Sequence, residues 1–276
     1  EPRRTPLAEH AGASREDDGM TDATRSGRLS TLMNSTIGAK IIMATTGAIL
    51  VGFLIVHMAG NLNVYAGPDA MNHYAQSLKS MPPLVWLVRI TLLVALIGHV
   101  ASAMKLKRIN TSARPVAYAT PRRYRVTTPA ARYMLMSGLV ILAFAVYHLL
   151  HFTVGAVHTE NFHLYETLDV ATQTWVRTEN QQLIDKLAPT LVRHDVFSMF
   201  VRGFQHPLIA GAYLLAQILL AMHLSHAVSS MLHTLGLSKG TAARARNDAI
   251  GRAIALLIFL PNLSFPIAVQ AGLIHL

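Results

Sequence analysis

The sequence contains no cysteine among its 276 residues. This absence excludes disulfide bonds, thiolate metal sites, ligation of an iron–sulfur cluster by this chain and covalently attached c-type haem. Charged residues are scarce as well, at 14% of the chain, whereas an ordinary soluble domain carries roughly a quarter. The shortage of charge disfavours a soluble enzyme, and hydrophobic residues fill 52% of the sequence instead.

The charges that are present are unbalanced. Lysine and arginine number 24 against 14 acidic residues, which gives a formal net charge of +10 at pH 7. A basic chain is a candidate for nucleic-acid binding, but here the basic residues stand beside long apolar runs. This arrangement indicates contact with a membrane surface and argues against a nucleic-acid partner.

A window of about 20 residues, the length that crosses ~30 Å of hydrocarbon, identifies five apolar segments. The expected spans cover approximately residues 41–62, 84–104, 133–154, 207–232 and 253–274. Five such runs leave too little polar sequence to cover them as buried helices of a soluble protein. The sequence therefore predicts an all-α integral membrane bundle formed by residues 36–276, preceded by a disordered tail over residues 1–35.

Basic side chains are concentrated in two of the loops between these spans. The loop after the second span holds Lys105, Lys107, Arg108, Arg114, Arg122, Arg123, Arg125 and Arg132, and the loop after the fourth holds Lys239, Arg244, Arg246 and Arg252. Because cytoplasmic loops are enriched in Lys and Arg, these loops and the N-terminus are predicted to be cytoplasmic and the C-terminus external. The long loop over residues 155–206 is then external, and the spacing in its second half predicts an amphipathic helix lying on the outer surface.

Histidine is frequent, with 14 residues, and several fall inside the spans, where ionisable side chains are costly and usually functional. On the predicted topology, the first and third spans are entered from the cytoplasm. His57 lies 17 residues after Lys40, and His148 lies 16 residues after Arg132. At about 1.5 Å per helical residue, these two histidines reach nearly the same depth, toward the outer face.

The second and fourth spans run in the opposite direction. His99 lies 16 residues after Pro83, and His223 lies 16 residues after Pro207, so both are predicted near the cytoplasmic face. Two imidazoles that face each other across a bundle form the axial ligand set of a b-type haem, which needs no cysteine. Zinc normally takes three or four protein ligands at one place, so two pairs at different depths fit two haems better.

Alternatives stay open around these four positions. His151 and His226 each follow a preferred ligand by three residues and share roughly its helix face. They are alternative ligands to His148 and His223, partners for a haem propionate, or side chains that only extend to the membrane interface. Small residues near the ligands are expected to let a flat ring approach the helix backbone; they are Gly52, Gly60, Gly98, Ala95 and Ala221.

Residues 35–275, approximately, resemble the five-helix, two-haem cytochrome b subunit of bacterial succinate:quinone oxidoreductases, the membrane anchor of succinate dehydrogenase or fumarate reductase. The resemblance is carried by motifs in a fixed order: STIGAKIIMATTG, HMAGNL, GPDAMNHYAQSL, GHVASAMKLKR, YHLLH, DVFSMFVRGFQHP and MHLSHAVSSMLHTLG. The family's haem ligands fall on His57, His99, His148 and His223, the same four residues that the depths select.

The resemblance implies that this chain performs no dicarboxylate chemistry itself. A flavoprotein subunit acts on succinate or fumarate, an iron–sulfur subunit passes electrons to the membrane, and the basic cytoplasmic loops are the expected dock for both. Two haem b groups then exchange electrons with a quinone in the membrane, with menaquinone favoured by analogy with two-haem members of the family. The expected location is the bacterial cytoplasmic membrane.

Quinone chemistry also needs a polar clamp for two carbonyl oxygens and a source of protons. The candidates near the outer surface are His73, Asn72 and Gln76 in the first external loop, with Arg89 in the second span. For Arg89, contact with the outer lipid headgroups is an open alternative. Asp69 is the candidate acid for proton uptake.

Two other classes of protein remain open from the sequence. One is a different two-haem membrane cytochrome b, such as a subunit of another quinone-linked reductase or a transmembrane ferric reductase, which would not purify with a flavoprotein of this kind. The other is a haem-free, proton-coupled transporter whose intramembrane histidines relay protons. A transporter of that kind would not absorb visible light.

Overall fold

The structure is a computed structural model that describes residues 35–113 and 127–276. Most of the predicted N-terminal tail, residues 1–34, lies outside the described residues. The same holds for four members of the basic loop, namely Arg114, Arg122, Arg123 and Arg125.

Five helices within the described ranges are long and apolar enough to cross a membrane. They are α2 (Thr36–Asn61), α4 (Pro82–Ser112), α6 (Met134–Leu149) with its π-helical continuation η2 (Leu150–Val154), α9 (Pro207–Thr234) and α10 (Gly240–Gln270). The predicted all-α bundle of five membrane helices is confirmed, and the chain is a multi-pass membrane protein. The sequence placed the start of the last span near residue 253, whereas α10 begins well before it. Its polar first turns are held to the connection between α9 and α10 through Asn247, whose amide donates to the Leu237 carbonyl at 3.1 Å.

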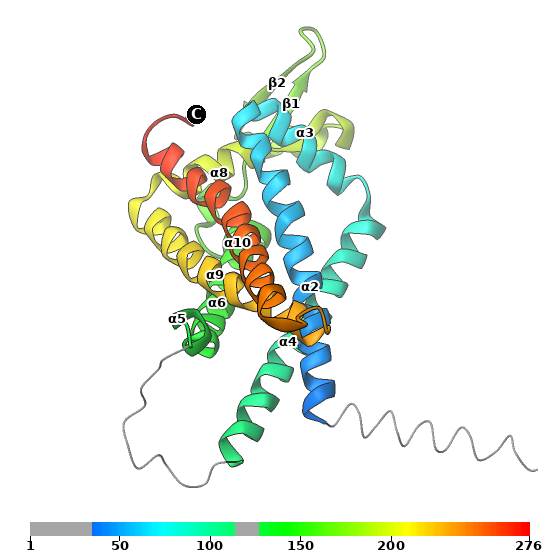
Figure 1. Ribbon diagram of the computed structural model, residues 1–276. Helices are drawn as coiled ribbons and strands as arrows, with labels where there is room; N and C mark the ends of the chain where they lie inside the picture. Colours follow the sequence, from blue (N-terminus) through cyan, green and yellow to red (C-terminus); the bar gives the residue numbers. More distant parts are fainter. Residues whose placement is uncertain (1–34, 114–126) are drawn as a thin grey trace, which may run out of the picture.

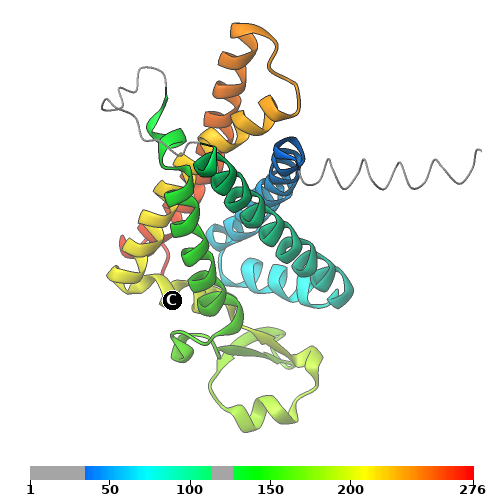
Figure 2. The ribbon, with the colours of Figure 1, turned by 90° about the horizontal axis from the view of Figure 1, so that it is seen from below.

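The helices pack in two main groups. α2 packs along α4, while α9 packs along α10 and also contacts α6 and α2. Figure 2 shows α2 beside α4, with α6 and α9 on the other side of the bundle. α9 and α10 approach backbone to backbone, because a Cβ atom at Gly251 would collide with the carbonyl oxygen of Ser225. α4 makes few close contacts with α6 or α9, so the two groups are joined mainly through α2 and α9.

Shorter elements gather at one end of the bundle, together with the C-terminus (Figure 1). They are η1 (Leu62–Ala66), α3 (Pro68–Lys79), η3 (Thr159–Asn161), β1 (Tyr165–Asp169), β2 (Thr174–Thr178), α7 (Gln181–Lys186), η4 (Pro189–Leu191), β3 (Val192–His194) and α8 (Val196–Gln205). We call residues 62–79 and 155–206 the cap. The four-residue helix α5 (Pro129–Arg132) precedes α6 and lies at the opposite end of the bundle (Figure 1).

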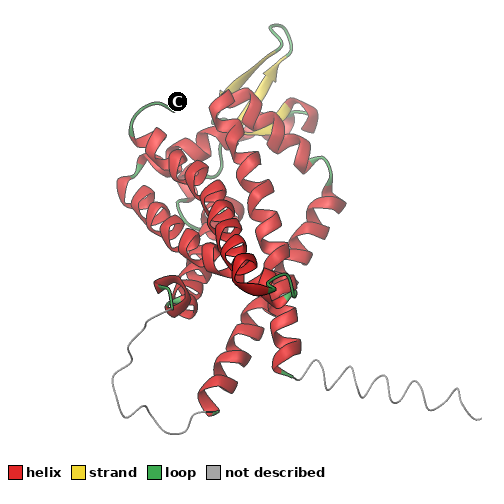
Figure 3. Ribbon diagram, viewed as in Figure 1, coloured by secondary structure: helices red, strands yellow, loops and turns green. Residues whose placement is uncertain are grey.

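The cap contains a small antiparallel sheet in the order β2-β1-β3, which the sequence analysis did not predict. Figure 3 shows these strands beside a fold that is otherwise helical. Glu166 on the central strand is the register partner of Arg177 on one side and of Arg193 on the other. The sheet therefore sets two arginines on either side of one glutamate.

The amphipathic helix predicted in the external loop is present as α8, but its predicted position on the surface is wrong. Its apolar side chains, including Phe197, Phe200 and Phe204, are buried, and so are Ser198 and Gly203. They form a core with Val64, Met71, Phe265 and other residues of η1, α3, α9 and α10. α8 is enclosed because α3, α9, α10 and η3 pack against it.

Candidate functional site

The four predicted haem ligands lie on four different membrane helices: His57 on α2, His99 on α4, His148 on α6 and His223 on α9. Their distance from the cap differs. α2 and α6 run toward the cap, and His57 and His148 lie close to those ends, whereas α4 and α9 start at the cap and carry their histidines in their second halves. The structure thus separates a cap-side pair, His57 and His148, from a far-side pair, His99 and His223.

The cap-side pair is in direct contact. The ring centroids of His57 and His148 are 5.8 Å apart, and the ring planes are nearly perpendicular, at 84°. Each ring also stacks on an aromatic residue one turn earlier in its own helix, His57 on Phe53 and His148 on Phe144. A bond from a metal ion to an imidazole nitrogen is about 2.0–2.1 Å long for zinc, so two imidazoles on opposite sides of one ion have centroids roughly 6 Å apart. The observed separation is close to that value.

His99 of the far-side pair is anchored on α2. Its Nδ1 atom lies 3.2 Å from the carbonyl oxygen of Met43 and 3.4 Å from the hydroxyl of Thr46. A carbonyl oxygen only accepts hydrogen bonds, so Nδ1 carries the ring hydrogen and donates it. In the neutral imidazole, Nε2 then keeps its lone pair, which is the form that binds a metal.

His223 is held in the same manner by α6. Its Nδ1 atom lies 3.2 Å from the hydroxyl of Ser137, and that hydroxyl donates its own hydrogen to the carbonyl of Met134 at 3.1 Å. Ser137 therefore accepts from Nδ1, which again leaves Nε2 of His223 as the free acceptor.

Two glycines allow these far-side rings to approach the neighbouring helices. A Cβ atom at Gly47 would lie 3.3 Å from the ring of His99, and one at Gly138 would lie 3.3 Å from the ring of His223. Neither glycine was among the small residues that the sequence analysis listed. Of those, Gly60 faces the ring of Tyr74 and Gly98 faces Thr46, so both serve contacts between protein groups.

The two histidine pairs are suited to a cofactor that binds one imidazole from each of two helices. Within the described residues, no three His, Asp or Glu side chains gather as a metal site, so a zinc centre of the usual type is not formed there. The far-side pair comes from α4 and α9, two helices that pack on others rather than tightly on each other. Haem b matches this donor set, because it needs two axial imidazoles.

The two alternative histidines differ in their surroundings. His151 lies in the π-helical turn η2 with only 2% of its surface exposed, and its Nδ1 atom lies 3.1 Å from the hydroxyl of Tyr213. His226 is half-buried one turn beyond His223 on α9. Tyr213, Ser137 and Thr46 were not singled out from the sequence, although a hydroxyl in an apolar span was an available signal.

The predicted quinone residues differ in their exposure. Asn72 is fully buried, whereas His73 on the same helix is exposed. Gln76 is partly exposed on the next turn of α3. Arg89 is exposed on α4, where its guanidinium lies 5.2 Å from the ring of Trp86. A tryptophan and an arginine at this position are typical of a membrane interface.

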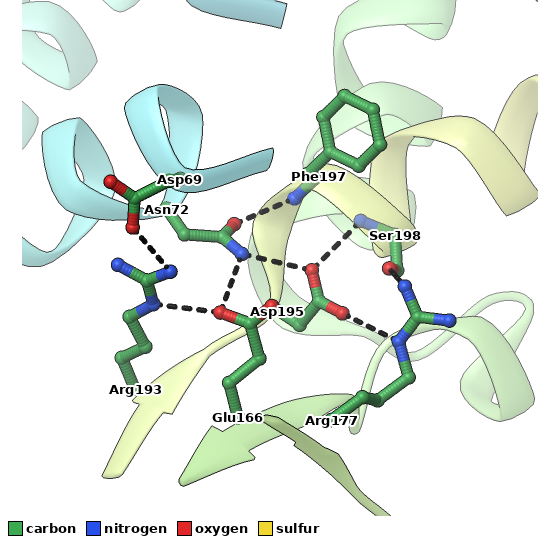
Figure 4. Close-up of polar contacts among 8 residues, drawn as sticks. All are labelled: Asp69, Asn72, Glu166, Arg177, Arg193, Asp195, Phe197 and Ser198. Carbon is green, nitrogen blue, oxygen red and sulfur yellow. Dashed lines mark hydrogen bonds and ion pairs between the residues drawn. The ribbon is translucent and has the colours of Figure 1, made fainter. Parts of the chain in front are cut away.

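Asn72 is instead the centre of a buried polar network in the cap (Figure 4). Its amide nitrogen donates to Glu166 and to Asp195, both at 3.0 Å, and its oxygen accepts from the backbone of Phe197 at 2.9 Å. All the hydrogen-bonding groups of this amide face protein partners, so α3 is tied to the sheet and to the start of α8.

Two arginines neutralise the acidic groups of this network. Arg193 donates to Glu166 at 2.7 Å and pairs with Asp69 at 2.8 Å, while Arg177 pairs with Asp195 at 2.9 Å and bonds the hydroxyl of Ser198. Asp69, the predicted acid for proton uptake, has 81% of its side chain exposed and is thus an ion-pair partner at the edge of the network.

Asp195 is the carboxylate of this network whose pKa shows the competing effects of burial and hydrogen bonding. Burial raises the pKa of this carboxyl, but hydrogen bonds from Ser198, Asn72 and Arg177 outweigh burial and hold the pKa below its ordinary value. Asp195 also caps α8 by accepting from the backbone of Ser198 at 3.0 Å, and a carboxylate is stabilised at a helix N-terminus. The charged form is therefore the structural form.

Comparison of the chain with models of protein families, with curated protein sequences and with solved structures finds no match.

Proposed function

We propose that this chain is the membrane-anchor cytochrome b subunit of a succinate:quinone oxidoreductase, which carries electrons between an iron–sulfur subunit and membrane quinone through two haem b groups. The observation that carries the proposal is the pairing of four histidines from four membrane helices at two levels. His57 and His148 would hold the haem nearer the cap, and His99 and His223 would hold the other. Haem iron with two imidazole ligands supplies one-electron transfer and offers no open position for oxygen.

The residues of the chain prepare this ligation before any cofactor binds. Met43 and Thr46 orient His99, and Ser137 orients His223, so that Nε2 of each ring is unprotonated. Such hydrogen bonds fix the tautomer and direction of a ligating histidine. For quinone, His73, Gln76 and Arg89 remain the proposed contacts, while Asn72 would act indirectly by holding α3 in place.

In this proposal, the end of the bundle that carries the basic loops lies in the cytoplasm, where a flavoprotein and an iron–sulfur subunit would dock. The described basic residues at that end include Lys105, Lys107 and Arg108 near the end of α4 and Arg244 and Arg246 at the start of α10. The cap and the C-terminus would then lie outside a bacterial cytoplasmic membrane. Menaquinone is the proposed quinone.

The first test is a reduced-minus-oxidised optical spectrum of the purified chain, with haem quantified per polypeptide. We expect about two haem b per chain. Replacing any one of His57, His99, His148 and His223 with alanine should remove one haem, whereas His226→Ala should leave both. A chain without haem would contradict the proposal and favour a proton-coupled transporter.

A second test separates this function from that of other two-haem cytochromes. The chain is purified from its native membrane under mild conditions, and the preparation is assayed for succinate-dependent reduction of a menaquinone analogue. Co-purification of a flavoprotein and an iron–sulfur protein supports the proposal. Two haems without these partners would indicate a subunit of another quinone-linked reductase or a ferric reductase.

A further inference from the structure

Tyr213 stands between two histidines of the neighbouring helix. Its hydroxyl oxygen lies 3.3 Å from Nδ1 of His148 and 3.1 Å from Nδ1 of His151. Tyr213 belongs to α9 and is 5% exposed, and its ring packs edge-to-face on Phe144 and Phe204. The hydroxyl is therefore fixed in place by its surroundings.

The hydroxyl of Tyr213 has one hydrogen, so it donates to at most one of the two imidazoles and can accept from either. If it accepts from His148, then Nδ1 of His148 carries the ring hydrogen and its Nε2 is a free lone pair. If it donates to His148, then Nε2 carries the hydrogen and does not bind a metal in that form.

His148 and His151 have different neighbours apart from Tyr213. His148 faces His57 across the helices at 5.8 Å, whereas His151 stacks on Phe152 at 3.9 Å. A Cβ atom at Gly203 would lie 3.2 Å from the ring of His151. Nε2 of His151 is buried and has no hydrogen-bond partner among the described side chains and backbone, so the chain of hydrogen bonds ends at this residue.

We propose that Tyr213 is a positioning residue for His148, accepting the hydrogen of its Nδ1 while its hydroxyl is also hydrogen-bonded to Nδ1 of His151, and that His151 supports this bridge without ligating iron. The inference rests on the proposed function, because it assigns His148 as the cap-side ligand. It goes further by naming the groups that select the tautomer of that ligand and by assigning a role to the second histidine of the YHLLH motif.

The expected consequence is electronic as well as structural. A ligating imidazole that donates its other hydrogen to an acceptor becomes more basic, which favours oxidised iron. Tyr213→Phe removes the acceptor and keeps the ring. We therefore expect the midpoint potential of the cap-side haem to become more positive while that of the far-side haem stays unchanged.

The experiment is a redox titration of both haems in the full chain, followed by optical and electron paramagnetic resonance spectra of each. Tyr147→Phe is the matched control, because Tyr147 lies next to His148 in the sequence while its hydroxyl contacts His158 at 3.2 Å. It should leave both potentials unchanged. His151→Phe removes the far partner of the bridge and should give a smaller positive shift of the same haem, with both haems retained.

The outcomes separate the two proposals. An unmodified chain without haem contradicts the proposed function, whereas two haems with unshifted potentials in Tyr213→Phe contradict only the role of Tyr213. If Tyr213→Phe does not fold, His151→Phe decides the assignment. Loss of one haem in His151→Phe would make His151 the ligand and overturn the inference, and retention of two haems with a positive shift supports it.

Discussion

Gly138 of α6 lies against the imidazole of His223 of α9, where a Cβ atom would be 3.3 Å from Cε1 of the ring. The same ring is hydrogen-bonded to Ser137, the residue before Gly138. One residue therefore orients the far-side histidine and the next gives it space. This arrangement gives the serine and the glycine at this level of α6 a shared role in placing His223.

Gly138→Val is expected to displace His223 and to remove the far-side haem while the cap-side haem remains. The valine side chain needs the volume that the imidazole occupies, and helix α6 cannot retreat without losing its contacts with α9. Haem content and the split of the absorption band measure the result. Gly211→Val on α9 is the control for the loss of a helical glycine, because no atom lies within 4 Å of a Cβ atom there. Equal loss of haem in both variants would contradict the role of Gly138.

Ser137→Ala is expected to weaken retention of the far-side haem without removing its ligand. The substitution leaves Nδ1 of His223 without its acceptor, and changes of this kind typically weaken metal binding by about 10–100-fold. Haem release to an excess of apomyoglobin gives the rate for each variant. Ser225→Ala is the matched control, because the hydroxyl of Ser225 donates to the carbonyl of Met222 and is not bonded to a histidine. An equal increase in the rate of haem release in Ser137→Ala and Ser225→Ala would contradict the role of Ser137.

The membrane helices and the four histidines were accessible from the sequence because both signals are local. A span is a continuous apolar run, and the depth of His57 or His148 follows from counting residues along one helix. The start of α10 was missed because its first turns are polar and are held by Asn247 against the connection between α9 and α10. The small sheet was missed because its strands are only three to five residues long.

The polar network of the cap could not be read from the sequence for a different reason. The amide of Asn72 binds Glu166 and Asp195, which are 94 and 123 residues away along the chain. No local pattern relates these positions, and a polar residue in a loop beside the membrane resembles a ligand-binding residue as much as a structural one. Only the fold shows that its hydrogen-bonding groups face other parts of the protein.

Asn72→Ala is therefore expected to destabilise the cap. The change leaves two buried carboxylates and the backbone N–H of Phe197 short of a partner, and each such loss costs about 1–3 kcal/mol. We expect the free energy of unfolding of the cap to fall by at least about 2 kcal/mol, measured by hydrogen exchange of α8. His73→Ala, at an exposed position on the same helix, is the control. An Asn72 variant with unchanged exchange but weaker quinone binding would assign Asn72 to the quinone site instead.

Acid is expected to loosen the cap in two steps, and the first depends on His194. Burial and the nearby charge of Lys79 lower the pKa of His194 from 6.5 to about 4. The unfolded cap therefore binds a proton that the folded cap does not, and stability falls as the pH decreases from 6.5 to about 4. Asp195 acts at lower pH, because its pKa lies below the ordinary 3.8 and its contribution is lost only as the carboxylate is protonated.

The fluorescence of Trp175 reports this transition, because its ring stacks on Arg193 at 4.3 Å. The sequence has 2 tryptophans, so a Trp86→Phe background isolates the signal. His194→Gln should abolish the pH dependence between 6.5 and about 4 and keep the loss at lower pH. A titration that is identical with and without His194 would show that another group controls the cap in this range.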